Sequence, residues 1–316
     1  MPSSAADDNR TGWAQGPPTD TVAELLRMLE LTISGRLDGV LHGNYQGLTP
    51  GHGSEPGESR QYQPGDDVRR IDWNVTARTN ETYIREQIAD HDLTAWLVVD
   101  TSAAMKFGTV ANSKSETALA TAAAIGFLTA RNQNRLGAVL IAGPDIRVIP
   151  PRSGKNQVRA ILSTIAAPPD SEGAGRADLA GALDRVGGLA KRRGFVAVIS
   201  DFGGSTWADA LGRLSLRHDL LAVTVHDPRE FDVPPIGFVE LVDPASGATR
   251  EVRVTAAVQR RFADAAMAAR TERLAHLNRT GADVIELATD SDWLGSVVNH
   301  VQRRRTQAVR GGVLRR

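Results

Sequence analysis

Residues 95–108, Ala-Trp-Leu-Val-Val-Asp-Thr-Ser-Ala-Ala-Met-Lys-Phe-Gly, decide the fold. Five apolar residues without polar alternation run directly into Asp100, which predicts a strand buried on both faces and therefore central in a parallel sheet. Asp100 then stands at the carboxyl end of the strand, where open α/β sheets bind ligands. A segment rich in Ser, Ala and Gly follows, and Ser113 and Glu116 have the spacing of a capping box that opens a helix.

The pattern recurs at residues 194–204, Gly-Phe-Val-Ala-Val-Ile-Ser-Asp-Phe-Gly-Gly. If the two strands are neighbours, Asp100 and Asp201 lie within reach of one another. Two carboxylates and the hydroxyl of Ser102 are hard oxygen ligands suited to Mg²⁺ or a similar cation. The alternative is that each aspartate only caps the turn or helix that follows it.

The composition is that of an ordinary globular chain with one large or two modest domains. The 316 residues are 41% hydrophobic and 23% charged. Lys+Arg and Asp+Glu both number 37, so no nucleic-acid partner is expected, and the lack of cysteine excludes disulfides and thiolate chemistry. No apolar run approaches the roughly twenty residues that span a bilayer. The N-terminus has no secretory signal, so a cytoplasmic location is the default expectation.

Strand and helix patterns alternate between residues 95 and 227, which predicts an α/β core. The expected strands cover residues 95–100, 136–142, 146–149, 195–200 and 220–225, and the expected helices 116–131, 156–165, 179–192 and 206–216. The second and third strands are too close for a crossover helix, so they form a hairpin around residues 143–145. The result is a mainly parallel sheet flanked by helices, with one antiparallel edge strand.

The segments that flank this core have different residue patterns. Residues 1–19 are expected to be disordered, and a helix beginning near Thr19-Asp20 joins a β-rich accessory segment to make up residues 20–94. Residues 228–254 are expected to form an accessory hairpin outside the main sheet, packed on residues 40–94. Residues 255–302 complete the core, with a helix over 255–280, a strand over 282–287 and a helix over 293–301. The basic tail, residues 303–316, is expected to be solvated.

The common catalytic motifs do not fit. Residues 149–156 lack the first glycine and the final hydroxyl of a phosphate-binding P-loop, and no Gly-x-Ser-x-Gly elbow occurs. The histidines lack the spacing of a zinc helix, and His218 and His226 are expected in turns or at the surface. The sequence therefore gives no positive sign of an enzyme.

The Asp100-Thr-Ser102-Ala-Ala104 loop, together with Ser200-Asp201 after a later strand, resembles a von Willebrand factor A domain. A fuller pattern over about residues 30–280 is similar to the family called domain of unknown function fifty-eight. That pattern consists of residues 60–73, 77–78, 100–105, 177–179, 200–202 and 226–230, in this order. Members of that family are typically encoded beside MoxR-type AAA+ ATPases.

The resemblance implies a Rossmann-like von Willebrand factor A domain with a metal-ion-dependent adhesion site. Asp100, Ser102 and Asp201 match its ligand positions, whereas Ala104 and Ala177 stand where the site has hydroxyls. The three matching residues and water could still hold Mg²⁺, more weakly, because magnesium readily keeps several waters. Asp178 would either add a second carboxylate or cap the following helix.

In a complete site of this kind, a carboxylate from a partner protein fills the open metal position. Because two hydroxyl ligands of the site are missing here, a second surface is also a candidate for partner binding. It contains acidic, basic and aromatic residues. It comprises Arg60, Tyr62, Asp66, Asp67, Arg69, Arg70, Asp72, Trp73 and Arg78. Arginine and aromatic residues are enriched at interface centres, although the same charges could form an internal salt-bridge network.

These patterns favour a non-enzymatic protein-binding module, an adaptor for a MoxR-type ATPase in chaperone-like assembly or maturation of client proteins. One alternative is a metal-dependent hydrolase that uses Asp100, Asp178 and Asp201, with His226 as general base. Another is a membrane-peripheral protein that uses its arginine-rich C-terminal tail.

Overall fold

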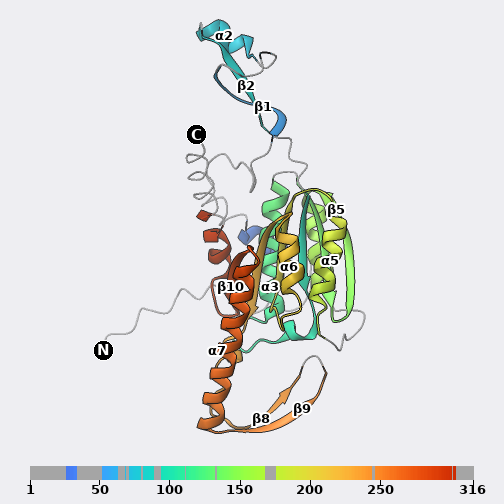
Figure 1. Cartoon of the computed structure of the whole chain (residues 1–316), viewed down its shortest axis with the longest axis vertical. Helices are drawn as coiled ribbons and strands as arrows, with labels where there is room; N and C mark the ends of the chain where they lie inside the picture. The colour runs from blue at the N-terminus through green and yellow to red at the C-terminus, as the bar shows by residue number, and fades with distance from the viewer. Residues whose placement is uncertain are drawn as a thin grey trace, which may run out of the picture. The chain divides into compact units, whose positions relative to one another are not determined.

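The computed structural model describes residues 26–33, 52–62, 68, 71–79, 81–88, 94–110, 112–131, 134–167, 176–243, 246–300 and 302–303. The chain divides into two compact units. Residues 43–92 form the smaller unit, and the described residues on either side of that segment belong to the larger one. Figure 1 labels the elements of both units.

A six-stranded sheet with the order β10-β7-β6-β3-β4-β5 forms the centre of the larger unit. The strands are β3 (Thr94–Asp100), β4 (Arg135–Ala142), β5 (Asp145–Ser153), β6 (Phe195–Ser200), β7 (Asp219–His226) and β10 (Asp283–Ala288). All neighbours are parallel except β4 and β5, which form the predicted hairpin. Numbered along the chain within this sheet, the strands run 3-2-1-4-5-6, the doubly wound order. The predicted fold class, a mainly parallel α/β sheet flanked by helices with one antiparallel edge strand, is confirmed.

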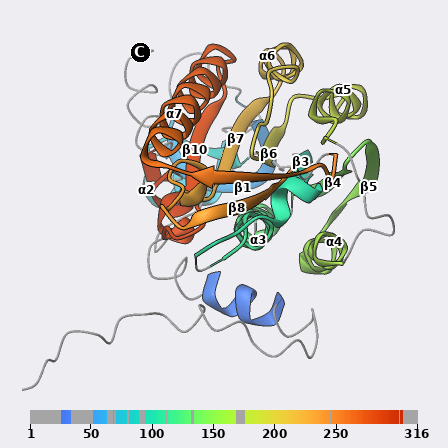
Figure 2. The same ribbon diagram turned by 90° about the horizontal axis from the view of Figure 1, so that it is seen from below.

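Helices cover both faces of the sheet (Figure 2). One face carries α3 (Lys114–Arg131) and α4 (Lys155–Ala166). The other carries α5 (Leu179–Leu189), α6 (Ala208–Ser215) and α7 (Ala256–Arg279). Residues 26–33 and 293–300 are also helical, and the short 3-10 turns η2 (Ala103–Lys106) and η3 (Pro228–Glu230) follow β3 and β7.

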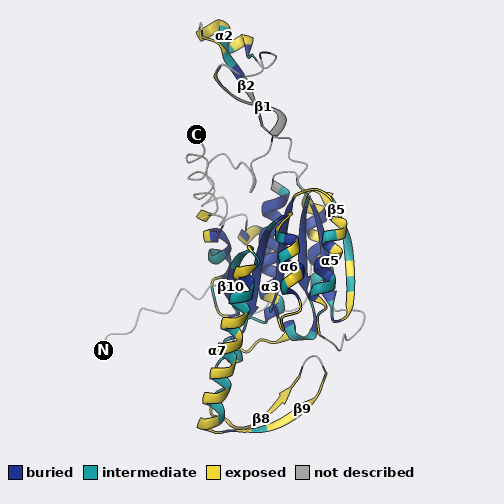
Figure 3. Ribbon diagram, viewed as in Figure 1, coloured by how far each residue is buried: buried dark blue, intermediate teal, exposed yellow. Residues whose placement is uncertain are grey.

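The apolar runs of the sequence form the core. β6 buries every residue and β3 every residue after Thr94, as expected for central parallel strands (Figure 3). Small residues allow close approach of the layers. A Cβ at Gly126 of α3 would lie 2.8 Å from Val158 Cγ1 of α4, and one at Gly137 of β4 would lie 2.8 Å from the Trp96 ring. The alanine-rich helix α3 is therefore closely packed, and residues 117–129 are all buried.

The register of the parallel strands determines where the site can form. Val98 of β3 pairs with Val198 of β6, which pairs with Ala222 of β7. The three strands therefore end at the same edge of the sheet. This edge brings together Asp100 and Asp201, as the sequence predicts, and adds Asp227, which follows β7.

A hairpin formed by β8 (Gly237–Val242) and β9 (Thr249–Val254) lies outside the six-stranded sheet, as predicted. It belongs to the larger unit. The expected packing of the hairpin on residues 40–94 stays a prediction. The helical residues 26–33 also belong to the larger unit, where Glu30 is bonded to Lys155 and Arg159 of α4.

The long helix α7 follows the hairpin and is mostly exposed. The structure describes α7 in full, and Leu277 is its buried residue. Val258 and Phe262 are half-buried, and Ala265 and Ala269 are exposed. The first half of α7 has this exposure because it extends beyond the sheet beside β8 and β9 (Figure 1).

The smaller unit contains β1 (His52–Gln61), β2 (Tyr83–Ile88) and α2 (Trp73–Thr79). β1 and β2 pair antiparallel with two shifts of register. Asp72 begins the helix, because its Oδ1 accepts hydrogen bonds from the main-chain N–H groups of Asn74 and Val75. The sequence predicts a β-rich segment here but does not predict β1 or α2 individually.

Some expectations fall outside the described residues. These are the expected disorder of residues 1–19, the start of the first helix, the partner-binding residues Asp66, Asp67, Arg69 and Arg70, and the tail after residue 303. Within the described ranges, each helix is too short or too polar to cross a membrane.

His218 lies in the turn between α6 and β7, one of the two placements that the sequence predicts, and it is buried rather than at the surface. Neither ring nitrogen has a hydrogen-bond partner in the structure. Burial and the nearby Arg217 lower the pKa of His218 below its usual value of 6.5. The unfolded chain therefore binds the proton more readily, so this group destabilises the fold as the pH falls below about 6.5.

We expect His218→Leu to reduce the loss of unfolding free energy that the wild type shows between pH 7.5 and 5.5 in urea titrations. Parallel curves of unfolding free energy against pH for the variant and the wild type would contradict this.

Candidate functional site

Asp100 ends β3 at the centre of the sheet edge. It is 2% exposed, and its Oδ1 accepts a hydrogen bond from the Ser102 main-chain N–H at 2.9 Å while its Oδ2 accepts one from Ser200 Oγ at 2.8 Å. Burial and the negative charge of Asp201 raise the pKa of Asp100, and these hydrogen bonds only partly oppose the rise. Asp100, at the end of β3, is therefore a buried carboxylate whose ionised form is disfavoured.

Asp201 is positioned by a sharp bend after β6. Phe202, the next residue, has a φ of +51°, the left-handed conformation that a bulky side chain seldom adopts. Its ring packs edge-on against Trp207 with centroids 5.0 Å apart, and the Trp207 indole donates hydrogen bonds to the carbonyls of Phe202 and Gly204. Core packing therefore holds the strained turn, and Asp201 Oδ1 accepts from the Gly203 N–H at 3.0 Å.

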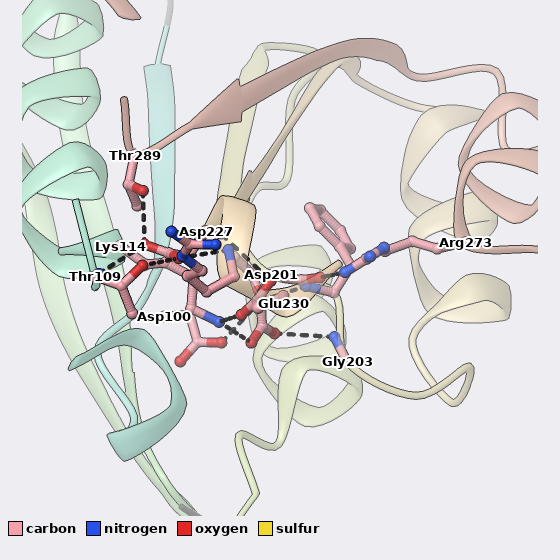
Figure 4. Close-up of polar contacts among 12 residues, drawn as sticks. Asp100, Thr109, Lys114, Asp201, Gly203, Asp227, Glu230, Arg273 and Thr289 are labelled. Carbon is pink, nitrogen blue, oxygen red and sulfur yellow. Dashed lines mark hydrogen bonds and ion pairs between the residues drawn. The ribbon is translucent and has the colours of Figure 1, made fainter. Parts of the chain in front are cut away.

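Lys114, the first residue of α3, points its ammonium group into this edge (Figure 4). Nζ lies 3.0 Å from Asp201 Oδ2 and 2.6 Å from Glu230 Oε1, and the lysine side chain is only 3% exposed. Burial alone would lower the pKa of Lys114, but the charges of Asp201 and Glu230 outweigh it, so the pKa is raised. The ammonium thus joins the loop after β6 to the turn after β7.

Asp227 follows β7 and is hydrogen-bonded to two other segments of the chain. It is 0% exposed, and it accepts hydrogen bonds from Thr109 Oγ1 at 2.6 Å, the Thr109 N–H at 2.9 Å, the Arg229 N–H at 2.9 Å and Thr289 Oγ1 at 2.8 Å. Burial opposes ionisation, but these hydrogen bonds lower the pKa of Asp227 overall. Asp227 and Glu230 also form a capping box around η3, which fixes the glutamate beside Lys114.

The structure brings together all three predicted ligand positions, Asp100, Ser102 and Asp201. Ser102 Oγ is buried and has no hydrogen-bond partner in the structure. Ala104 and Ala177 contribute no side-chain oxygen. Asp178 caps α5, because its Oδ1 accepts from the Gly181 N–H at 2.9 Å. Within the described ranges, no three His, Asp or Glu side chains are grouped to hold a metal ion.

Sequence reasoning missed Lys114, Asp227, Glu230 and Arg273 as parts of this site. Arg273 of α7 donates a hydrogen bond to the main-chain oxygen of Asp201. A signal existed for Asp227 and Glu230, because an aspartate follows a third buried strand with a glutamate three residues later. Lys114 and Arg273 carried no such signal, since each stands in an ordinary helix pattern.

The second predicted surface lies in the smaller unit. Trp73 is 70% exposed on α2, Arg78 is exposed at the end of the same helix, and Tyr62 is half-buried. Asp72 is buried at the start of α2. Asp66, Asp67, Arg69, Arg70 and the side chain of Arg60 lie outside what the structure describes. His226, the base in the hydrolase alternative, packs edge-on against Phe231 with ring centroids 5.2 Å apart.

A family model described as "Protein of unknown function DUF58" matches residues 58–272. The chain belongs to this family. Uncharacterized protein Rv1480 of Mycobacterium tuberculosis H37Rv is 46% identical over 291 residues, which cover 92% of each chain.

Solved structures of similar fold include von Willebrand factor A-type domains. An aerotolerance-related membrane protein from Bacteroides fragilis aligns with a TM-score of 0.44 and 13% identity, over 68% of this chain and 99% of that one. The SpRpn10 VWA domain aligns with a TM-score of 0.38 and 14% identity, over 66% of this chain and 94% of that one.

Proposed function

We propose that this DUF58 protein is a non-enzymatic protein-interaction module that serves a cytoplasmic MoxR-type AAA+ ATPase in chaperone-like assembly or maturation of client proteins. The observation that carries the interaction role is the hairpin β8–β9. Ile236, just before it, and Phe238, Leu241 and Val242 within it are all exposed. The ATPase partner rests on the family resemblance.

The hairpin lacks the support that a two-stranded ribbon normally needs. Both strands are exposed over nearly their whole length, and they form a sheet of their own (Figure 3). An isolated hairpin is marginally stable in water, and clustered exposed apolar side chains mark interaction surfaces. Its two outer edges also offer unpaired backbone groups to another chain. A partner that covers this ribbon would supply the burial that it lacks in the isolated chain.

The aromatic surface on α2 is a second candidate contact. A tryptophan 70% exposed on a short helix is costly to leave in water and is the residue type most enriched at interface hot spots. Trp73, with Tyr62 and Arg78, belongs to the surface that the sequence marked for partner binding. We expect it to contribute separately from the hairpin.

Co-purification with the cognate ATPase tests this function. We expect tagged full-length protein to retain the ATPase, and Ile236→Ser/Phe238→Ser and Trp73→Ala each to weaken retention at least about tenfold. Leu216→Ser is the matched control, because Leu216 is an exposed apolar residue remote from both surfaces in sequence. Failure of the wild-type chain to retain the ATPase, with or without nucleotide and Mg²⁺, would contradict the proposal.

A further inference from the structure

The family resemblance implies a divalent cation at the carboxyl edge of the sheet, and the side chains there test whether one fits. Asp201 is the ligand that matters most, because Asp100 is almost fully enclosed. Asp201 Oδ1 already accepts from the Gly203 N–H, and Oδ2 already lies 3.0 Å from the Lys114 ammonium. A divalent ion on Asp201 would therefore lie beside a buried positive charge, where little water screens the repulsion.

The remaining donors do not compensate for that repulsion. Ala104 and Ala177 have no side-chain oxygen to offer, and Glu230 is held by the same ammonium at 2.6 Å. Ser102 Oγ is the one remaining side-chain oxygen among the predicted ligands, and it is buried beside Asp100. A neutral hydroxyl is a weaker ligand for a hard cation than a carboxylate, and the carboxylates of Asp201 and Glu230 are already paired with Lys114.

We propose that the Lys114 ammonium takes the place of the divalent ion, so that this edge of the sheet is a metal-independent site. The lysine joins the elements that an ion would join: it starts α3, contacts Asp201 after β6 and contacts Glu230 in η3 after β7 (Figure 4). Unlike an ion, this cation is covalently attached and cannot dissociate. The inference concerns the isolated chain and stands apart from the proposed ATPase partnership.

Titration with Mn²⁺, followed by electron paramagnetic resonance and calorimetry, tests this assignment on the full-length protein. Four proteins form the experiment: the wild type, Lys114→Met, Ala104→Ser/Ala177→Thr, and the triple variant that combines these changes. We expect no saturable binding in the wild type or in the Ala104→Ser/Ala177→Thr variant, since both retain the lysine. The triple variant should bind one Mn²⁺ saturably, at least about tenfold more tightly than any residual binding by those two proteins.

Two results would overturn the proposal. One is saturable Mn²⁺ binding by the wild type or by Ala104→Ser/Ala177→Thr that Asp100→Asn abolishes, because the lysine would then not exclude the ion. The other is a folded triple variant that binds no Mn²⁺. Circular dichroism checks folding, and Lys114→Gln, whose amide can still donate to a carboxylate, replaces Lys114→Met if that change prevents folding.

Discussion

Replacing Asp227 with asparagine is expected to lower the free energy of unfolding by about 3 kcal/mol at pH 7. The carboxylate accepts four hydrogen bonds at 0% exposure, two from Thr109 and one each from Arg229 and Thr289. The amide nitrogen of asparagine cannot accept, so at least one of these donors would face another donor in a fully buried site. Because the bonds link three separate segments, their loss should also loosen the turn that carries Glu230.

The pH dependence of this effect distinguishes an ionised Asp227 from a neutral one. The pKa of Asp227 is lowered in the folded chain, so its contribution to stability is present above about 3.9 and is lost as the pH falls toward the folded value. The difference in unfolding free energy between wild type and Asp227→Asn should therefore shrink in urea titrations on going from pH 7 to pH 4 and below.

The control is Asp290→Asn, at an exposed position on the loop that carries Thr289, which should change the free energy of unfolding by less than about 0.5 kcal/mol. A similarly small loss for Asp227→Asn would contradict the hydrogen-bonding assignment.

Lys114→Met is expected to cost about 2–3 kcal/mol at neutral pH. The methionine retains the apolar stem but removes the charge, so Asp201 and Glu230 would repel one another and Asp100. Breaking a fully buried ion pair can cost more, but the carboxylate side chains are 18% and 28% exposed, and water would partly rehydrate them.

The matched control is Lys155→Met, because the Lys155 side chain also forms an ion pair, with Glu30, but is 60% exposed. This substitution should lower the free energy of unfolding by less than about 1 kcal/mol. Adding Glu230→Gln to Lys114→Met should recover part of the loss, because it removes one of the unpaired charges. Thermal and urea unfolding of the single and double variants measure this coupling. Losses that simply add would show that Lys114 and Glu230 do not interact in solution.

The sequence predicts the central sheet well because its strands are continuous apolar runs that only a buried parallel sheet accommodates. The convergence of Asp100 and Asp201 follows from that sheet. β1 and α2 were not predicted, since β1 contains Gly53, Pro56 and Gly57, which disfavour strands, and α2 is only seven residues long. Their formation depends on pairing with β2 and on the Asp72 cap.

The polar network at the site could be predicted only in part. A lysine at the start of a helix normally faces water, and the burial of Lys114 depends on where the loops after β6 and β7 lie in space. Similarly, α7 has a continuous helical pattern, but nothing in that pattern indicates that its first half extends beyond the sheet. Such features depend on tertiary arrangement rather than on local periodicity.

The interaction role is tested most directly by a binding isotherm between the full-length chain and its cognate MoxR-type ATPase, measured by biolayer interferometry. We expect saturable binding, in EDTA without nucleotide as well as with nucleotide and Mg²⁺, that Ile236→Ser/Phe238→Ser weakens and Leu216→Ser leaves unchanged. Absence of saturable binding in both conditions would contradict it.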